Sequence, residues 1–227
     1  MKLSFELSSA TRPETVEVDF QQCIVAGWAG RDLAATEHHI EELALLGVTR
    51  PSSVPLFYRI ASNQLVQDPI IDVVGEETSG EAEVFLFSHQ GETLVSLSSD
   101  HTDRKLEAHS VALSKQICAK PLARHAWRHA EVADHWDDLI LRSWIKEDGN
   151  PVLYQEGNLG TLLPPLELAQ RFFGSIRVPE GSGMTCGTVS TIGAIRPASG
   201  LKMELFDPKL GRSITHAYTL CVLPEIA

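Results

Sequence analysis

The feature that most restricts the fold of this chain is a pair of largely apolar segments on either side of a four-residue turn. Residues 81–87 read EAEVFLF, residues 92–100 read ETLVSLSSD, and SHQG lies between them. Gly91 can adopt the left-handed backbone conformation that a short hairpin loop requires. The two segments are therefore predicted to pair as antiparallel strands.

Three carboxylates occur at the open end of this predicted hairpin. Side chains two positions apart on a strand project from one side, so Glu81 and Glu83 are expected to lie close together. Asp100, at the far end of the partner strand, can supply a third oxygen ligand. Mg²⁺ and Mn²⁺ prefer oxygen ligands, and three carboxylates leave coordination positions for a bidentate substrate. The pattern indicates a catalytic cation site rather than a structural one.

The same residues also have a simpler interpretation. Glu81 and Glu83 can both face solvent on one side of an antiparallel sheet, and the local pattern alone favours that arrangement. Asp100 can equally be a turn residue or a helix cap, because SSDHTD at 98–103 contains several good N-cap residues. The order of motifs along the rest of the chain decides between the two interpretations.

Other segments predict a chain of mixed helices and strands. Strands are expected within 14–28, at 56–60, 70–74, 184–189, 201–207 and 213–223, and a strand, a turn at 147–151 and a second strand within 135–157. Helices are expected at 32–46, where Gly47 would follow the last turn, and at 103–115 and 165–173. No repeat, low-complexity tract or linker divides the sequence.

Charge and cysteine spacing disfavour several classes of function. The formal net charge is −11 and the 19 lysine and arginine residues are scattered, which argues against nucleic acid and anionic membranes as partners. The 4 cysteines form no CxxC pair, so neither a zinc knuckle nor a redox motif is indicated. No apolar run approaches the ~18 residues that span a bilayer, and the first residues contain no apolar signal segment. A cytoplasmic protein is expected.

Seven short motifs follow one another in an order that resembles the fumarylacetoacetate hydrolase superfamily. They are CIVAGW (23–28), HIEE (39–42), LFYR (56–59), EAE (81–83), DHTDR (100–104), SKQ (114–116) and CGTV (186–189). Each motif is unspecific alone, but the order is specific. The resemblance extends from Ile24 to Leu220, nearly the whole chain, and is to a divergent, uncharacterised branch of that superfamily.

This resemblance implies a fold, an assembly and a class of reaction. The implied fold is α+β and predominantly β, a mixed β-sandwich roll formed as a single domain over residues 1–227, with a short N-terminal strand region at about 1–20, and assembled as a homodimer. The implied activity is that of a hydrolase or lyase with one Mg²⁺ or Mn²⁺ per chain. Such an enzyme acts on a small 2-oxo or β-dicarbonyl acid by C–C bond hydrolysis, decarboxylation, hydration or tautomerisation through a metal-stabilised enolate.

The resemblance also implies roles for individual residues. The metal ligands fall on Glu81, Glu83 and Asp100, the catalytic residues on His39, Glu42 and Lys115, and the substrate contacts on Arg59, Arg104, Gly187 and Thr188. Lys115 would stabilise developing negative charge, and His39 with Glu42, three residues apart on a helix, would form an acid/base pair on a lid. Arg59 would clamp a substrate carboxylate.

Several alternatives remain open at these positions. His38 with Glu41 competes with His39 and Glu42 for the acid/base role, because both pairs have the same spacing. Arg59 can instead pair with an aspartate on a neighbouring strand, and Lys115 by itself can be a solvated charge. The family's asparagine-tyrosine before the lid histidine is absent, and Val189 replaces a proline, so substrate specificity is expected to have shifted.

Two other functions are compatible with the same residues. A non-catalytic homologue that binds metal and metabolite is the alternative that the altered lid favours, and a purely structural dimer without metal is a third. His125, His129 and His135 include an HxxxH spacing, but no convincing third ligand and general base accompany it, so a zinc site is not predicted. Arg124 and Arg128, which lie beside these histidines, instead indicate a solvated or interface surface.

Overall fold

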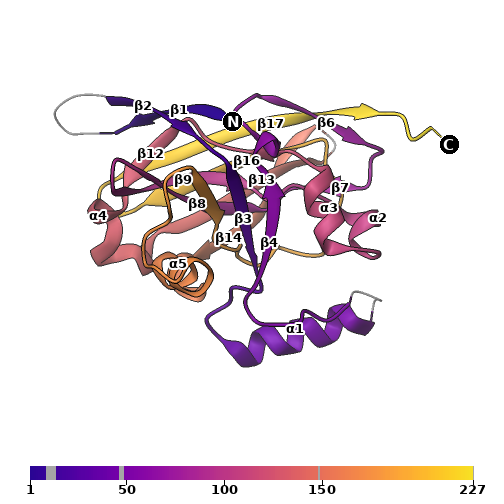
Figure 1. Ribbon diagram of the computed structural model, residues 1–227. Coiled ribbons are helices and arrows are strands. Elements are labelled where there is room, and N and C mark those ends of the chain that lie inside the picture. The colour runs from indigo at the N-terminus through magenta and orange to yellow at the C-terminus, as the bar shows by residue number, and fades with distance from the viewer. Residues whose placement is uncertain (9–13, 46–48, 148, 227) are drawn as a thin grey trace.

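A computed structural model describes residues 1–8, 14–45, 49–147 and 149–226, except for the side chains of 39, 42 and 43. The chain forms an eight-stranded sheet, a five-stranded sheet and two small two-stranded sheets (Figure 1). Five α-helices and three 3₁₀ turns connect these strands within the described residues. No helix among them has the length and apolar composition needed to span a membrane.

The eight-stranded sheet is mixed and has the strand order β2-β1-β12-β9-β8-β15-β3-β4. Its strands are β1 (Lys2–Leu7), β2 (Glu14–Asp19), β3 (Gln22–Gly27), β4 (Leu56–Ala61), β8 (Ala82–His89), β9 (Glu92–Ser99), β12 (His125–Arg128) and β15 (Ser182–Thr185). The predicted hairpin of β8 and β9 lies at its centre. The hairpin turn is formed by Gln90 and Gly91, both with positive φ, as a tight two-residue hairpin requires.

The five-stranded sheet has the order β14-β13-β16-β17-β6 and packs against one face of the first sheet. Its strands are β6 (Ile70–Val74), β13 (Ile140–Glu147), β14 (Asn150–Asn158), β16 (Gly200–Asp207) and β17 (Arg212–Leu223). The two small sheets pair β5 (Leu65–Val66) with β11 (Lys120–Pro121), and β7 (Thr78–Ser79) with β10 (Thr102–Asp103). Both small sheets bring segments that flank the hairpin next to its open end.

The helices lie at the periphery of the sheets. They are α1 (Leu33–Leu45), α2 (Arg104–Glu107), α3 (Val111–Ile117), α4 (His129–Val132) and α5 (Pro165–Phe173). In Figure 1, α1 stands apart from the body of the molecule below β3 and β4, whereas α2 and α3 pack beside β7. The end of α5 is capped by Gly174 in the left-handed conformation, as is common at helix ends.

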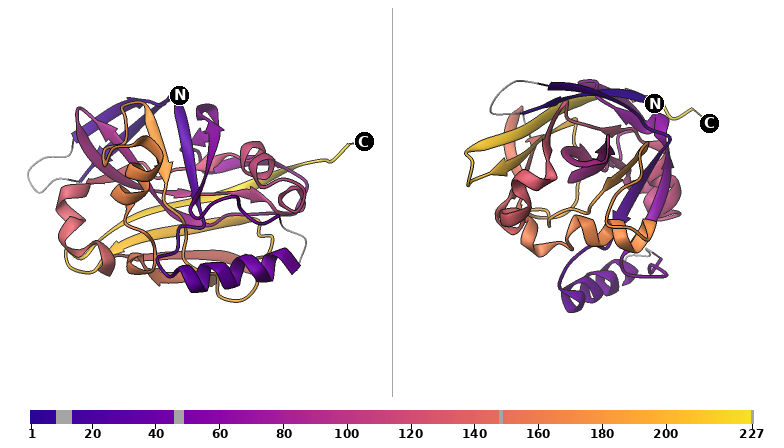
Figure 2. Two further views of the ribbon diagram at one scale, coloured as in Figure 1. Left: turned by 60° about the horizontal axis from the view of Figure 1, so that its bottom comes forward. Right: turned by 60° about the vertical axis from the view of Figure 1, so that its left-hand side comes forward.

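Two hydrophobic clusters fill the two faces of the eight-stranded sheet. The larger cluster lies between the two large sheets and includes Ile24, Val84 and Leu141. The smaller one lies on the other face, which the curled sheet encloses (Figure 2), and there Phe5 and Phe20 pack with Phe85 and Phe87. Alternate residues of β8 contribute to one cluster or the other, since side chains alternate across a strand. Whether a residue of β8 has an even or an odd number therefore decides which of the two hydrophobic clusters its side chain enters.

Most sequence-predicted elements are present, but three differ. The single helix expected at 103–115 is two helices, because Ser110 accepts a hydrogen bond from the Leu113 N–H and starts a new helix. The strand expected at 184–189 occupies Ser182–Thr185 instead. The segment around His125, expected to be a solvated or interface surface, keeps Arg124 and His125 exposed, but it includes β12, whose Ala126 and Trp127 are buried between β1 and β9, and His135 is buried.

Candidate active site

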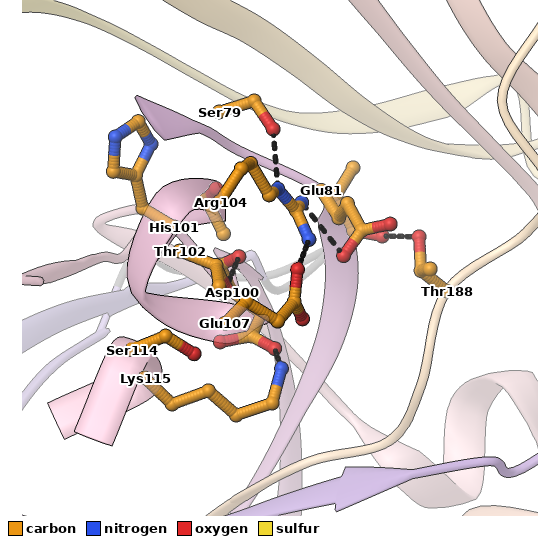
Figure 3. Close-up of polar contacts among 12 residues, drawn as sticks. Ser79, Glu81, Asp100, His101, Thr102, Arg104, Glu107, Ser114, Lys115 and Thr188 are labelled. Carbon is orange, nitrogen blue, oxygen red and sulfur yellow. Dashed lines mark hydrogen bonds and ion pairs between the residues drawn. The ribbon is translucent and has the colours of Figure 1, made fainter. Parts of the chain in front are cut away.

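The candidate site lies where β8 begins and β9 ends. Ala82 pairs with Ser99 in the antiparallel register, and the Asp100 N–H donates to the Glu81 carbonyl oxygen at 2.9 Å. Strand pairing therefore brings the three predicted carboxylates to one end of the hairpin, where Figure 3 shows Glu81 and Asp100 beside Arg104 and Lys115.

Glu83 points into the interior rather than toward solvent. Its residue is 3% exposed and shares a strand face with Phe85 and Phe87 of the smaller hydrophobic cluster. Its Oε2 accepts a hydrogen bond from the Gly187 N–H at 2.9 Å. Burial, and then the nearby charge of Asp100, raise the pKa of Glu83 to about 8. The solvent-facing alternative is therefore wrong for Glu83.

Asp100 is buried between two lysines. The Lys115 Nζ donates to its Oδ2, and the Lys120 Nζ lies 3.3 Å from its Oδ1. Burial disfavours the charged carboxylate, but the ammonium groups of Lys115 and Lys120 outweigh that effect and lower the pKa of Asp100 to about 2. Burial alone would lower the pKa of Lys115, yet the charge of Asp100 raises it above its usual value. Asp100 and Lys115 thus form a tight buried ion pair.

Arg104 holds the third predicted ligand. Its guanidinium pairs with Glu81 Oε2 at 3.1 Å and with Glu107 Oε2 at 2.9 Å, and its Nε donates to Ser79 Oγ at 2.7 Å. Arg104 begins α2, which Asp103 caps by accepting from the Leu106 N–H. The predicted substrate contact Arg104 is therefore at the site, where it binds Glu81 in this structure.

The Gly187–Thr188 loop meets the start of β8 from the other side. Gly187 has a φ of 84°, which favours glycine at this position. The Thr188 hydroxyl donates to the Ala82 carbonyl oxygen at 2.7 Å and accepts from Gln155 Nε2, also at 2.7 Å. Both predicted residues thus lie at the site and fix the backbone around Glu83. The buried Gln155, which also accepts from the Ala82 N–H, was not predicted.

The remaining predicted residues are placed less directly at the site. Arg59 is exposed on β4, and the neighbouring Tyr58, on the opposite face of the strand, packs toward the interior. The Lys115 Nζ lies 5.7 Å from the centre of the Tyr58 ring, so Tyr58 is the β4 residue that borders the site. The side chains of His39 and Glu42 are outside the described part of α1, and the acid/base pair stays a prediction.

The donor set suits a divalent cation in its chemistry. Asp100 Oδ1 is buried and has no hydrogen-bond partner among the described residues, and the neighbouring Glu83 carboxyl is disfavoured as an isolated anion. A cation between them would satisfy both groups. In this structure, however, the carboxylates pair with arginine and lysine side chains. No three His, Cys, Asp or Glu side chains in the described ranges converge as a ligand set. Glu81 would have to leave Arg104, and Asp100 would have to leave Lys115, for all three to bind one ion.

Comparison with known sequences places residues 26–218 in a family described as Protein of unknown function (DUF2848). No curated protein sequence matches the chain significantly.

Several solved structures have a similar fold. A 2-keto-3-deoxyarabinonate dehydratase aligns with a TM-score of 0.65 and 16% identity over 91% of this chain and 75% of its own. A 2-keto-3-deoxy-D-arabinonate dehydratase complexed with magnesium and 2,5-dioxopentanoate aligns with a TM-score of 0.64 and 16% identity over 96% and 79%. The 4-oxalocrotonate decarboxylase from Pseudomonas putida G7, complexed with calcium and acetate, aligns with a TM-score of 0.52 and 16% identity over 88% and 76%. At these identities the likeness shows the fold, which is shared with members of the fumarylacetoacetate hydrolase superfamily.

Proposed function

This chain belongs to the DUF2848 family, whose function is unknown, and we propose that it is a divalent-metal-dependent enzyme acting on a small 2-oxo or β-dicarbonyl acid. The observation that carries the proposal is the buried carboxylate pair of Glu83 and Asp100, with an Asp100 oxygen that has no hydrogen-bond partner in the described part of the chain. Lys115 and Lys120 stabilise the Asp100 carboxylate, but the buried Glu83 carboxylate is unfavourable as an anion unless a cation binds it.

The fold neighbours support the same class of reaction. One of them binds magnesium and 2,5-dioxopentanoate, and another binds calcium and acetate. We extend the proposal to the finer features that the motif order implies: a mixed β-sandwich roll over residues 1–227 as one domain, a homodimer in the cytoplasm, and one Mg²⁺ or Mn²⁺ per chain in a hydrolase or lyase of a divergent branch.

In this proposal Glu81, Glu83 and Asp100 hold the cation. When bound, it would act as a Lewis acid on the oxo and carboxylate oxygens of the substrate. Lys115, once released from Asp100, would donate a hydrogen bond to the oxygen that gains negative charge during the reaction. The Tyr58 ring beside Lys115 would limit where that ammonium group can move.

The acid/base step is assigned to a different part of the chain. His39 and Glu42 share one face of α1, so the carboxylate could orient the imidazole and the imidazole could activate water or move a proton. Since α1 stands apart from the sheets in Figure 1, it would have to approach β4 to act on a substrate. Gly187 and Thr188 border the carboxylates, and Arg59 on β4 and Arg104 at the start of α2 are the proposed substrate contacts.

The proposal is tested by turnover with a defined metal. The purified protein is stripped with a chelator, reloaded anaerobically with Mg²⁺ or Mn²⁺, and mixed with acylpyruvates, oxaloacetate and related oxo-acids while enol absorbance is followed. Turnover of at least one compound with metal, and its loss with chelator, is expected. A protein with Glu81→Gln and Glu83→Gln that binds the ion as tightly as the parent would contradict the ligand assignment.

The second candidate is a homologue that binds metal and metabolite without turnover. It is favoured by one observation: Arg104 and Lys115 already engage Glu81 and Asp100, so the site is stable without a ligand. Ligand binding in calorimetry, without conversion of any oxo-acid in the panel, would support this candidate instead.

A further inference from the structure

Lys120 is the most deeply buried cation next to the proposed ligands. It lies on β11, which pairs in parallel with β5, and its residue is 0% exposed. Its Nζ donates to the His101 carbonyl oxygen and lies 3.3 Å from Asp100 Oδ1, the oxygen that has no hydrogen-bond partner within the described ranges. A fully buried lysine is rare because removing the ammonium group from water is costly. Its position beside this one oxygen therefore needs an explanation.

The charges around the site define what a cation would encounter. Three side-chain cations face four carboxylates within the described cluster: Arg104, Lys115 and Lys120 against Glu81, Glu83, Asp100 and Glu107. With all of these groups ionised, one negative charge is in excess. A divalent cation would turn that excess into a surplus of one positive charge, which is unfavourable in a buried cluster. One carboxylate on a small ligand would restore neutrality.

Without Lys120 the cluster would have a different net charge. Two cations would then face four carboxylates, and a single divalent cation would neutralise the cluster alone. Lys120 also lies beside the Asp100 oxygen that would otherwise be free to bind an ion. Both the charge of Lys120 and its position therefore disfavour binding of a divalent cation without an accompanying anion.

We propose that Lys120 competes with the divalent cation for Asp100, so that the site takes up the cation tightly only together with an anionic ligand. This inference rests on the proposed function, since it concerns the same cation. The anion in question is a small carboxylate, such as the acid group of an oxo-acid. Uptake of the metal and of the substrate would then be coupled, and each would raise the affinity for the other by the same factor.

Lys120 also has a structural role, which the test must separate from competition for Asp100. Its hydrogen bond to the His101 carbonyl oxygen holds the turn that follows Asp100. Lys120→Met removes both the charge and the hydrogen bond, whereas Lys120→Gln removes the charge and keeps a donor. Lys105→Met is the matched control, because Lys105 pairs with Glu225 at the surface, where both side chains are mostly exposed.

The experiment measures Mn²⁺ binding to the metal-free protein from the paramagnetic resonance signal of free Mn²⁺. Each protein is titrated in chloride and in pyruvate at matched ionic strength, and binding of Mn²⁺ by pyruvate itself is measured without protein and subtracted. The parent and Lys105→Met should bind Mn²⁺ about tenfold or more tightly with pyruvate than with chloride. Lys120→Met and Lys120→Gln should bind it about tenfold more tightly than the parent in chloride, with little further gain from pyruvate.

The other outcomes are decisive as well. If the parent binds Mn²⁺ equally tightly with and without pyruvate, and as tightly as the Lys120 variants, the metal site stands but Lys120 does not compete for it. If Lys120→Met alone differs from the parent and Lys120→Gln does not, Lys120 acts through its hydrogen bond and the competition is refuted. If no protein binds Mn²⁺ in either salt, the proposed function fails and this inference fails with it.

Discussion

Two buried ion clusters in this chain are built differently. At the end of β16, both oxygens of Asp207 are used: Oδ1 accepts from His135 Nε2 at 3.0 Å and from the backbone N–H groups of Lys209 and Leu210 at 3.1 Å, and Oδ2 accepts from Arg212 Nε at 3.3 Å. Burial opposes ionisation there, but the Leu210 N–H and His135 lower the pKa of Asp207 below its usual value. Both oxygens of this carboxylate are therefore satisfied by the protein itself.

The cluster at the start of β8 is not completed in this way. Asp100 is just as buried, but its Oδ1 has only the charge of Lys120 at 3.3 Å and no hydrogen bond from any described residue. The pKa of Asp100 is lowered, as that of Asp207 is, but the pKa of its neighbour Glu83 is raised. A buried carboxylate whose oxygens are all hydrogen-bonded contributes to stability, and one with an oxygen that lacks a hydrogen bond can still accept a ligand.

Removing a carboxylate from the complete cluster should have the largest effect on stability. Asp207→Ala leaves the buried His135 without its partner and leaves Arg212 with Glu131 alone, so we expect a loss of about 3–5 kcal/mol in the free energy of unfolding, measured with urea. Lys120→Met, which removes a cation from the incomplete cluster, should change stability by less than about 1 kcal/mol. An equal loss in both variants would abolish the distinction between the two clusters.

Removing a cation from each cluster should separate catalysis from stability. Lys115→Met is expected to lower kcat and kcat/KM together by about 100-fold, or about 2.7 kcal/mol, because the ammonium would act mainly on charge formed in the transition state. Arg212→Met should leave kcat per folded molecule near the parental value. The rates are compared at saturating metal, with thermal stability checked, and a parental kcat in Lys115→Met would show that the lysine has no catalytic role.

Glu83 and Asp207 should also make stability depend on pH in opposite directions. The Glu83 pKa is raised from 4.5 to about 8, so between these values the unfolded chain is ionised while the folded one holds a proton, and stability falls as pH rises. Asp207, with its lowered pKa, contributes stability above its ordinary value that is lost on acidification. In metal-free protein, urea unfolding at pH 5, 6.5 and 8 should show a fall of at most about 1.4 kcal/mol per pH unit. Glu83→Gln should remove this fall, and an unchanged slope would place the titrating group elsewhere.

An exposed ion pair should have the smallest effect on the free energy of unfolding. Arg171 and Glu167, four residues apart on α5, form an ion pair at 2.6 Å with both side chains more than 40% exposed. Arg171→Met should change the free energy of unfolding by no more than about 0.5 kcal/mol. A larger effect in the same urea assay would mean that the loss in Asp207→Ala cannot be attributed to burial.

The parts of the fold that local pattern determines could be predicted from the sequence. The β8–β9 hairpin follows from two alternating segments around Gly91, and α5 follows from its proline start and helical spacing. The three carboxylates were found for the same reason, since the hairpin brings Glu81 and Asp100 to one end. The shared fold with oxo-acid enzymes could also be predicted, because the motif order extends along nearly the whole chain.

The parts that depend on distant partners could not be predicted. Nothing near Lys120 distinguishes it from a surface lysine, and only the pairing of β11 with β5 buries it. β12 is four residues long and only its pairing with β1 and β9 buries Ala126 and Trp127, so the strand was not predicted, whereas Arg124 beside it is exposed as expected. Strand alternation separates Tyr58 from Arg59, but it does not say which of the two faces the carboxylates.

The position of β17 has a consequence for the order in which this chain can fold during synthesis. β17 pairs with β6, about 150 residues earlier, and its Tyr218 hydroxyl hydrogen-bonds to Ser99 at 2.8 Å and to the His101 ring at 2.9 Å on either side of Asp100. These contacts cannot form until β17 has left the ribosome, and such non-local pairing is slow. During translation, β6 therefore stays unpaired, and the turn that carries Asp100 lacks this anchor, until β17 has emerged.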